Sequence, residues 1–192
     1  MRKLIAVFVM LMLASAAFAQ TEIVGSKESV YELGVVFPLR SNAVKDFIAA
    51  HNVGVLPMTS GVGSGCQAGK HWVVSSEATV GVVCGFNMFI GSGNGGTNHI
   101  YELESLVVGR LYFGESWRGG LYAELGSGPQ VTIAKFPGES LLYQVNITTQ
   151  VGVGYNYRFS GDVTIGAGIK TTPSLSITNM LDGTKVVVSM LW

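Results

Sequence analysis

A period-two alternation of apolar and polar side chains over residues 143–159 restricts this segment to an extended strand. Apolar residues fill the odd positions except at Thr149, and the even positions carry amides, hydroxyls, glycines and Arg158. An amphipathic helix would instead repeat its apolar positions every three or four residues. A tilted strand needs about ten residues to cross a bilayer, so this one is long enough to span a membrane.

Seven further segments show the same alternation. They cover residues 31–37, 61–69, 78–90, 101–113, 121–131, 163–169 and 183–192. An even number of strands brings both ends of the chain to one side, as in bacterial outer-membrane barrels. The sequence therefore predicts an all-β fold, an eight-stranded antiparallel transmembrane β-barrel of the up-and-down type.

The connections between these segments are expected to alternate in length. The compact ones cover residues 70–76, 114–118 and 160–161, and the longer ones cover 40–57, 91–98, 133–139 and 172–182. Outer-membrane barrels have short periplasmic turns and longer outer loops. The order of lengths predicts that the second, fourth and sixth connections face the periplasm.

The first residues are typical of a secretory signal peptide. Arg2 and Lys3 precede an apolar stretch over residues 4–13, and small residues follow at 17–19. This combination predicts export and cleavage near Ala19. Residues 1–19 are then the signal peptide, and residues 20–192 form one outer-membrane barrel domain.

The composition excludes several classes of function. The formal net charge is zero and 12% of residues are charged, so no basic field indicates nucleic-acid binding. Mean hydropathy is +0.41, yet no apolar run after residue 19 approaches the roughly 18 residues of a spanning helix. No His and Cys cluster suggests a metal, and we expect no cofactor.

Charged side chains gather on the polar face of the predicted strands. They are Glu32, Glu102, Glu104, Arg110, Glu124, Arg158, Lys170 and Lys185. The interior of an eight-stranded barrel is just wide enough for side chains, and glycines on the same face leave room for longer ones. We predict a lumen network that closes the barrel. A soluble lipocalin-like barrel would reverse the two faces, with an apolar cavity and a polar exterior.

Aromatic side chains are expected at the two rims of the barrel, where membrane and water meet. The set assigned to the periplasmic rim is Trp72, Phe113, Trp117, Tyr157, Phe159 and Trp192.

Two cysteines, Cys66 and Cys84, fall on neighbouring predicted strands of an exported chain. They form either a cross-strand disulfide or two free thiols that face lipid. The choice depends on the strand register, which the sequence leaves open.

The chain ends in an alternating apolar pattern made by Val186, Val188, Met190 and Trp192. With the signal peptide, the strand count and the loop pattern, it resembles the small eight-stranded outer-membrane proteins of the OmpA-barrel and OmpX-like superfamily. The resemblance covers residues 20–192. It implies outer-membrane lipid and the outer-membrane assembly machinery as partners, with the terminal pattern as the assembly signal. That superfamily includes structural proteins, adhesins and enzymes.

The expected role is structural or interactive, with an extracellular ligand meeting the outer loops and the oligomeric state left open. A narrow solute pore and a lipid A-modifying acyl enzyme are the alternatives. The His-x-Ser pair of lipid A deacylases is absent from the sequence. Ser41, Asp46 and His51 have the residue types for acyl transfer, but their spacing equally suits a short capped helix.

Overall fold

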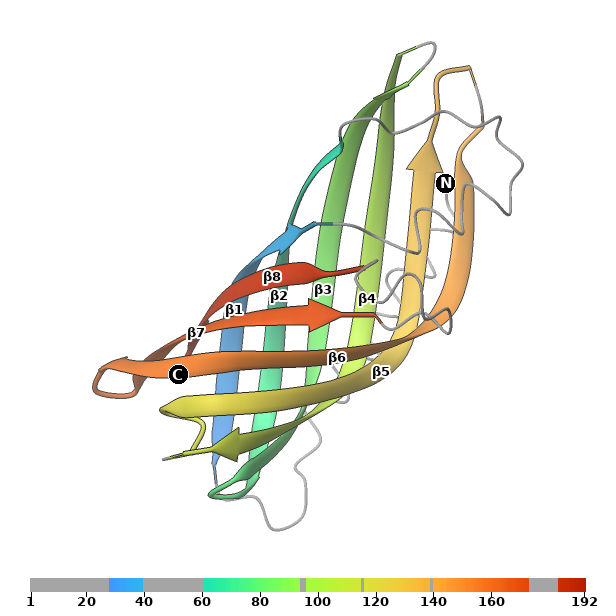
Figure 1. Ribbon diagram of the computed structural model, residues 1–192. Helices are drawn as coiled ribbons and strands as arrows, with labels where there is room; N and C mark the ends of the chain where they lie inside the picture. The colour runs from blue at the N-terminus through green and yellow to red at the C-terminus, as the bar shows by residue number, and fades with distance from the viewer. Residues whose placement is uncertain (1–27, 40–60, 94–95, 115, 139, 173–182) are drawn as a thin grey trace.

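Eight antiparallel strands close into one barrel in the computed structural model, which describes all residues except 1–27, 40–60, 94–95, 115, 139 and 173–182 (Figure 1). The strands are β1 Ser29–Pro38, β2 Gly61–Ser75, β3 Ala78–Gly93, β4 Gly96–Phe113, β5 Gly120–Lys135, β6 Leu142–Ser160, β7 Val163–Thr171 and β8 Lys185–Leu191. Each strand pairs with its neighbours in sequence, and β8 pairs with β1. The predicted all-β, up-and-down barrel is confirmed.

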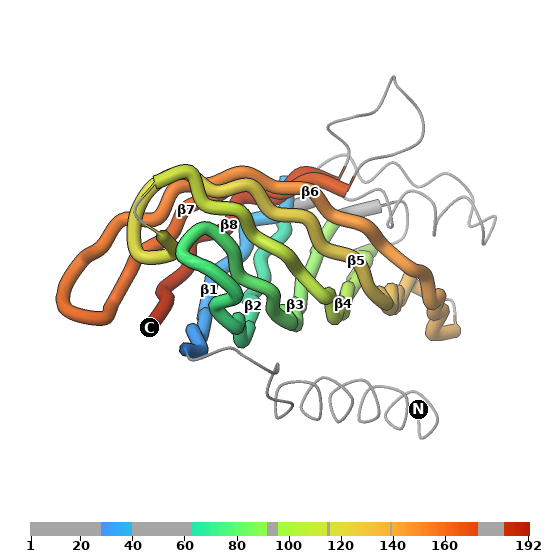
Figure 2. The backbone as a smooth tube through the Cα atoms, turned by 90° about the horizontal axis from the view of Figure 1, so that it is seen from below, coloured from blue at the N-terminus to red at the C-terminus, as the bar shows by residue number. Residues whose placement is uncertain are grey.

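Seen along the barrel in Figure 2, the strands follow one another in sequence order around the wall. Among the described residues, no helix is long and apolar enough to span a membrane.

The connections define two ends of the barrel. We call the end with the connections after β2, β4 and β6 the turn end, and the opposite end the loop end. At the turn end the connections are residues 76–77, 114–119 and 161–162. The two long connections at the loop end are residues 39–60 and 172–184. The third connection is shorter than expected, because residues 91–93 and 96–98 continue β3 and β4 as paired strands. Only residues 94–95 separate these two strands.

The barrel wall is uneven in height. Strands β3 to β6 have between 16 and 19 residues, whereas β7, β8 and β1 have 9, 7 and 10. Figure 1 shows the β3–β4 and β5–β6 hairpins rising at the loop end beyond β7 and β8. Among the described residues, one side of the loop end is therefore a taller sheet than the other.

The register fixes the shear of the barrel. Pairs followed from Val187 through β1, β2 and β3 lead to Glu102 on β4. Pairs followed from Val187 through β7, β6 and β5 lead to Tyr112 on the same strand. The difference, 112 − 102 = 10, is the shear of the sheet. A staggered closure of this kind tilts the strands, typically by about 35–45°, and leaves an interior that side chains can fill.

The two faces of the wall differ as the alternation predicted. Outward apolar side chains such as Leu33, Leu125 and Val153 are more than half exposed, whereas most inward side chains on β1 and β5 are buried. Since apolar residues on an exposed face cost stability in water, this outer surface suits a lipid environment.

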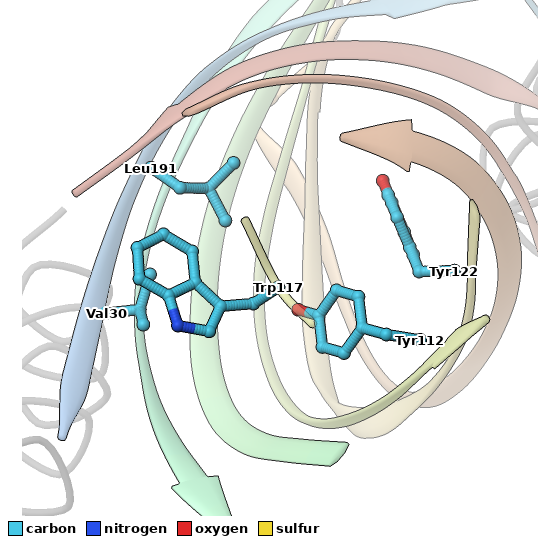
Figure 3. Packing of buried hydrophobic residues seen from close by; sticks show 5 residues of the cluster. All are labelled: Val30, Tyr112, Trp117, Tyr122 and Leu191. Atoms are coloured by element: carbon cyan, nitrogen blue, oxygen red, sulfur yellow. The ribbon is translucent and has the colours of Figure 1, made fainter. Parts of the chain in front are cut away.

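Trp117 departs from its expected rim position and is only 4% exposed, whereas Trp72, also 4% exposed, keeps the outward parity of Val80 at the turn end. Trp117 lies inside the turn end of the barrel, in an apolar cluster with four other residues shown in Figure 3: Val30, Tyr112, Tyr122 and Leu191. The chain at Trp117 turns inward there, and the Asn156 side-chain amide donates a hydrogen bond of 2.7 Å to the Trp117 carbonyl oxygen. The expected rim residues Phe113, Tyr157, Phe159 and Trp192 are exposed.

Gly154 on β6 makes room for the Tyr122 ring. A Cβ at this position would lie 2.5 Å from the Tyr122 hydroxyl oxygen, closer than any van der Waals contact allows. We expect Gly154→Ala to lower the free energy of unfolding by about 1–3 kcal/mol, since the core must shift to admit the methyl group. Urea unfolding in detergent micelles, followed by tryptophan fluorescence, measures this loss.

Gly109 on β4 provides the matched control, because a Cβ there would meet nothing within 4 Å. Gly109→Ala is expected to change the free energy of unfolding by less than about 1 kcal/mol. Equal losses in the two variants would show that Tyr122 is not the cause.

Candidate functional site

Glu32 on β1 is the centre of a buried polar network in the lumen. Its Oε2 accepts hydrogen bonds from Arg110 Nη2 at 2.7 Å and from His71 Nε2 at 2.8 Å. Its Oε1 accepts a bond from the Gln67 side-chain amide at 2.7 Å. All four side chains are almost completely buried, so the carboxylate is satisfied by protein groups in place of water.

Arg110 on β4 extends the network to the other side of the lumen. Its Nε donates to Glu124 Oε2 on β5 at 2.6 Å, and Lys170 Nζ on β7 lies 2.7 Å from the second oxygen of Glu124. The guanidinium carbon also lies 5.1 Å from the centre of the Tyr122 ring, in a cation–π contact. The chain of contacts thus joins β1, β2, β4, β5 and β7 across the barrel.

The network is balanced in charge. Two carboxylates, Glu32 and Glu124, face two cations, Arg110 and Lys170. Burying a charge without a partner is strongly unfavourable, so each of these groups depends on the others. His71 needs no charge of its own, since a neutral ring with hydrogen on Nε2 can donate to Glu32.

The packing around His71 depends on a glycine. A Cβ at Gly81 would lie 2.5 Å from His71 Nδ1, so a larger residue would displace the ring. This agrees with the expected use of inward glycines as space for longer side chains.

Apolar clusters lie on both sides of the network along the barrel. The cluster of Figure 3 fills the turn end, and Val83, Leu106 and Val108 pack together nearer the loop end. Closer still to the loop end is a third cluster, formed by Phe89, Ile100, Ala134 and Phe136. A second ion pair joins Lys185 on β8 to Glu104 on β4. The lumen is therefore occupied by side chains at several levels.

Six of the eight charged residues expected in the lumen take part in these ion pairs: Glu32, Glu104, Arg110, Glu124, Lys170 and Lys185. Glu102 is buried on the same inner face of β4. Arg158 corrects the expectation. It is exposed near the turn end, and its Nε donates to the Gly161 carbonyl oxygen at 3.1 Å, because β6 continues beyond the filled part of the barrel.

Three buried residues of the site were not among the expected ones. His71 was placed in a turn, since the second strand was expected to stop at residue 69, whereas β2 continues to Ser75. Tyr112 and Tyr122 share the inward parity of Arg110 and Glu124, so the alternation alone could have placed them. Their rings pack at 6.0 Å, and the Tyr112 hydroxyl lies 3.3 Å from Thr79 Oγ1.

The acyl-transfer candidates Ser41, Asp46 and His51 lie outside the described residues, as does the expected signal peptide at 1–19. Within the part of the chain that the structure describes, no group of three or more His, Cys, Asp or Glu side chains could hold a metal ion.

The residues of the expected assembly signal lie in β8 and directly after it. Val188, Met190 and Trp192 are between 42% and 44% exposed on the outer face, and Val186 is partly exposed. Tyr31 stacks on Trp192 at 6.3 Å.

Cys66 and Cys84 are both free thiols. Cys66 pairs with Phe86 and Cys84 with Ala68, so the two cysteines are diagonal neighbours on the outer face and not direct partners. Of the two alternatives that the sequence left open, the structure has the free thiols.

These features define the class of the fold, that of the small eight-stranded outer-membrane β-barrels. Neisserial surface protein A shares it with a TM-score of 0.52 and 12% identity, over 87% of this chain and 96% of that one. No protein-family model and no curated protein matches the sequence.

Two other solved barrels align with lower TM-scores. The N-terminal barrel domain of OprF from Pseudomonas aeruginosa gives 0.45 at 12% identity, covering 87% of this chain and 99% of its own. Ail from Yersinia pestis gives 0.47 at 14% identity, covering 85% and 93%.

Arg110→Ala would leave two buried carboxylates without their shared cation. We expect a loss of about 3–5 kcal/mol in the free energy of unfolding, the usual cost of breaking a buried ion pair by removing one partner. Urea unfolding in micelles measures the change.

Arg118→Ala is the control, because Arg118 also bridges two carboxylates but is partly exposed at the turn end. Exposed ion pairs contribute about 0–1 kcal/mol, so this variant should remain close to the unmodified protein. Equal losses in the two variants would contradict a special role for the buried network.

Proposed function

We propose that residues 20–192 form an outer-membrane barrel, exported after cleavage near Ala19, whose role is structural or interactive. The support for the location is the outer face, where large hydrophobic residues are exposed: leucine, valine, isoleucine, methionine and aromatic side chains. A soluble barrel of this size would expose polar residues on that face. The support for a scaffold role is a lumen filled with paired charges and apolar clusters.

The closed lumen depends on one observation above all, the Arg110 guanidinium held between Glu32 and Glu124. These three side chains come from β1, β4 and β5, and each is less than 5% exposed. A continuous aqueous pathway would require these groups to separate, and each buried charge would then lose its partner. This favours a closed barrel over the narrow pore.

The partners follow from the two ends of the barrel and from its outer face. Outer-membrane lipid contacts the apolar exterior, and the assembly machinery reads the terminal pattern of Val186, Val188, Met190 and Trp192. At the loop end, the connections and the tall β3–β6 wall meet the surroundings, where an extracellular ligand would bind. In this proposal the loop end is outside the cell and the turn end is periplasmic, as in barrels with short periplasmic turns.

Val153 tests the membrane location. It lies on the outer face of β6, in the half of the strand that is closer to the turn end, and is 63% exposed. Val153→Arg would place a charge near the bilayer midplane. We expect a loss of about 2–4 kcal/mol in the free energy of unfolding in lipid vesicles, measured by urea titration.

Phe159→Arg is the control for depth. Phe159 is 67% exposed and belongs to the last turn-end residues of β6, where charge costs only about 0–1 kcal/mol in a membrane. A soluble barrel would tolerate both arginines, so two small losses would refute the membrane location.

Conductance in a planar lipid bilayer tests the closed lumen. We expect the unmodified barrel to give no steady open-channel current, because the network and clusters occupy the lumen. Arg110→Ala is expected to introduce brief openings, and Arg118→Ala is expected to behave like the unmodified barrel. A steady current from the unmodified barrel would make the narrow pore the better account.

A further inference from the structure

Lys70 is a charged residue on the outer face of the barrel wall. It pairs with Tyr31 of β1, whose ring is 46% exposed on that face. Among the outward positions of the eight described strands, the formally charged residues are Lys70 and Lys135. Lys135 is the last residue of β5 at the loop end, whereas Lys70 lies inside β2, which continues to Ser75. The charge of Lys70 therefore belongs to the wall itself.

Aromatic rings contact the Lys70 ammonium. Its Nζ lies 5.4 Å from the centre of the Trp72 ring and 5.8 Å from the centre of the Tyr31 ring, in two cation–π contacts. Tyr31 also stacks on Trp192 at 6.3 Å, and the two residues exchange backbone hydrogen bonds of 2.8 and 3.1 Å. Because β8, β1 and β2 are neighbours in the wall (Figure 1), these side chains form one group. We call Tyr31, Lys70, Trp72 and Trp192 the aromatic–lysine patch.

The Trp72 indole contributes a hydrogen-bond donor to the patch. Trp72 has outward parity at the turn end and is 4% exposed, and its Nε1 has no hydrogen-bond partner among the described residues. A buried N–H group is normally satisfied by protein, by water or by a bound ligand, since leaving it unpaired costs stability. The patch therefore holds a donor that requires an acceptor.

The ammonium and the indole N–H of the patch suit an anion. An ammonium has three N–H donors and an indole has one, and neither group can accept a hydrogen bond. With three donors, a contact of Lys70 within the chain still leaves others for a ligand. Charge-assisted hydrogen bonds from lysine to a phosphate are roughly twice as strong as bonds between neutral groups. This donor set selects an anionic oxygen and disfavours a cation.

The surroundings of the patch favour a lipid as the source of that anion. Val82 lies opposite Lys70 on β3, and Leu33 and Ala68 pair with each other on the loop-end side of it. In the proposed membrane, tyrosine and tryptophan mark the level where headgroups meet hydrocarbon. An ionisable residue within a membrane-spanning wall is costly and usually marks a functional site. A phospholipid supplies a phosphate for Lys70 together with acyl chains for the apolar wall.

We propose that the aromatic–lysine patch binds the phosphate of an anionic phospholipid in the leaflet at the turn end. The phosphate oxygens accept hydrogen bonds from Lys70 Nζ and Trp72 Nε1. The rings of Tyr31 and Trp192 pack against the glycerol and the first methylene groups of the same lipid. The inference rests on the proposed membrane location, and it identifies the class of lipid that this part of the wall prefers.

The binding of single lipids tests the proposal. The protein is purified from membranes in a non-ionic detergent and titrated with dioleoyl-phosphatidylglycerol or with dioleoyl-phosphatidylcholine. Native mass spectrometry counts the bound lipids, and inorganic phosphate is added as a competitor. We expect phosphatidylglycerol to bind more tightly than phosphatidylcholine and inorganic phosphate not to displace it. Lys70→Gln should weaken the binding of phosphatidylglycerol about fivefold, the usual contribution of one lysine at an anionic membrane surface.

Lys135→Gln is the matched control, because it removes the other outward lysine at the opposite end of the wall. It should leave the affinity for phosphatidylglycerol unchanged, as should Lys70→Arg, which keeps the charge. Trp72→Phe keeps an aromatic ring but removes the N–H donor, and it is expected to weaken binding about two- to tenfold. A shift in gel mobility on heating verifies that each variant is folded.

Any of three results would overturn the proposal. The first is equal affinity of the unmodified protein for the two lipids. The second is equal affinity of Lys70→Gln and Lys135→Gln for phosphatidylglycerol, because the preference would then lie outside the patch. The third is displacement of the lipid by inorganic phosphate, which would make the patch a site for free phosphate. Val153→Arg in vesicles measures the membrane location independently, so a failure of the lipid site is distinguished from a failure of the proposed location.

Discussion

The interior of the barrel is organised around one guanidinium group. Arg110 holds Glu32 on one side and Glu124 on the other, and it is the cation that these two buried carboxylates share. The neighbouring glycines and rings are arranged to admit this arginine and its partners: Tyr122 lies against it, and Gly154 leaves space for Tyr122. A glycine on one strand thus leaves the space that a large side chain on the neighbouring strand fills.

The closure of the sheet explains why these partners meet. A shear of ten residues brings residues that are far apart in the chain to the same level of the lumen. Glu32 and Arg110 are separated by 78 positions in sequence and yet form a hydrogen bond of 2.7 Å. The backbone of the closed part of the wall is satisfied by strand pairing, so the side chains inside can be polar without competing for backbone partners.

Much of this structure could be predicted from the sequence, since period-two alternation determines which residues face in. The inward placement of Glu32, Arg110 and Glu124 follows from parity alone. Their pairing does not, because it depends on the register between strands. His71 was missed because polar residues near a glycine-rich strand resemble a turn. Trp117 was misplaced because a connection that folds into the lumen has no periodic signal.

The unequal strand lengths have a consequence for the lipid around the barrel. At a tilt of about 40°, the 19 residues of β6 rise by roughly 48 Å and the 7 residues of β8 by roughly 18 Å. The hydrocarbon core of a bilayer is about 30 Å thick, so in the proposed membrane β6 is longer than the core is thick and β8 is shorter. Hydrocarbon chains beside β8 must shorten or the barrel must lean toward its low side. In the proposed membrane, the described strands would therefore give the surrounding lipid a direction, either through a thinned sector next to β7 and β8 or through a lean of the barrel toward that side.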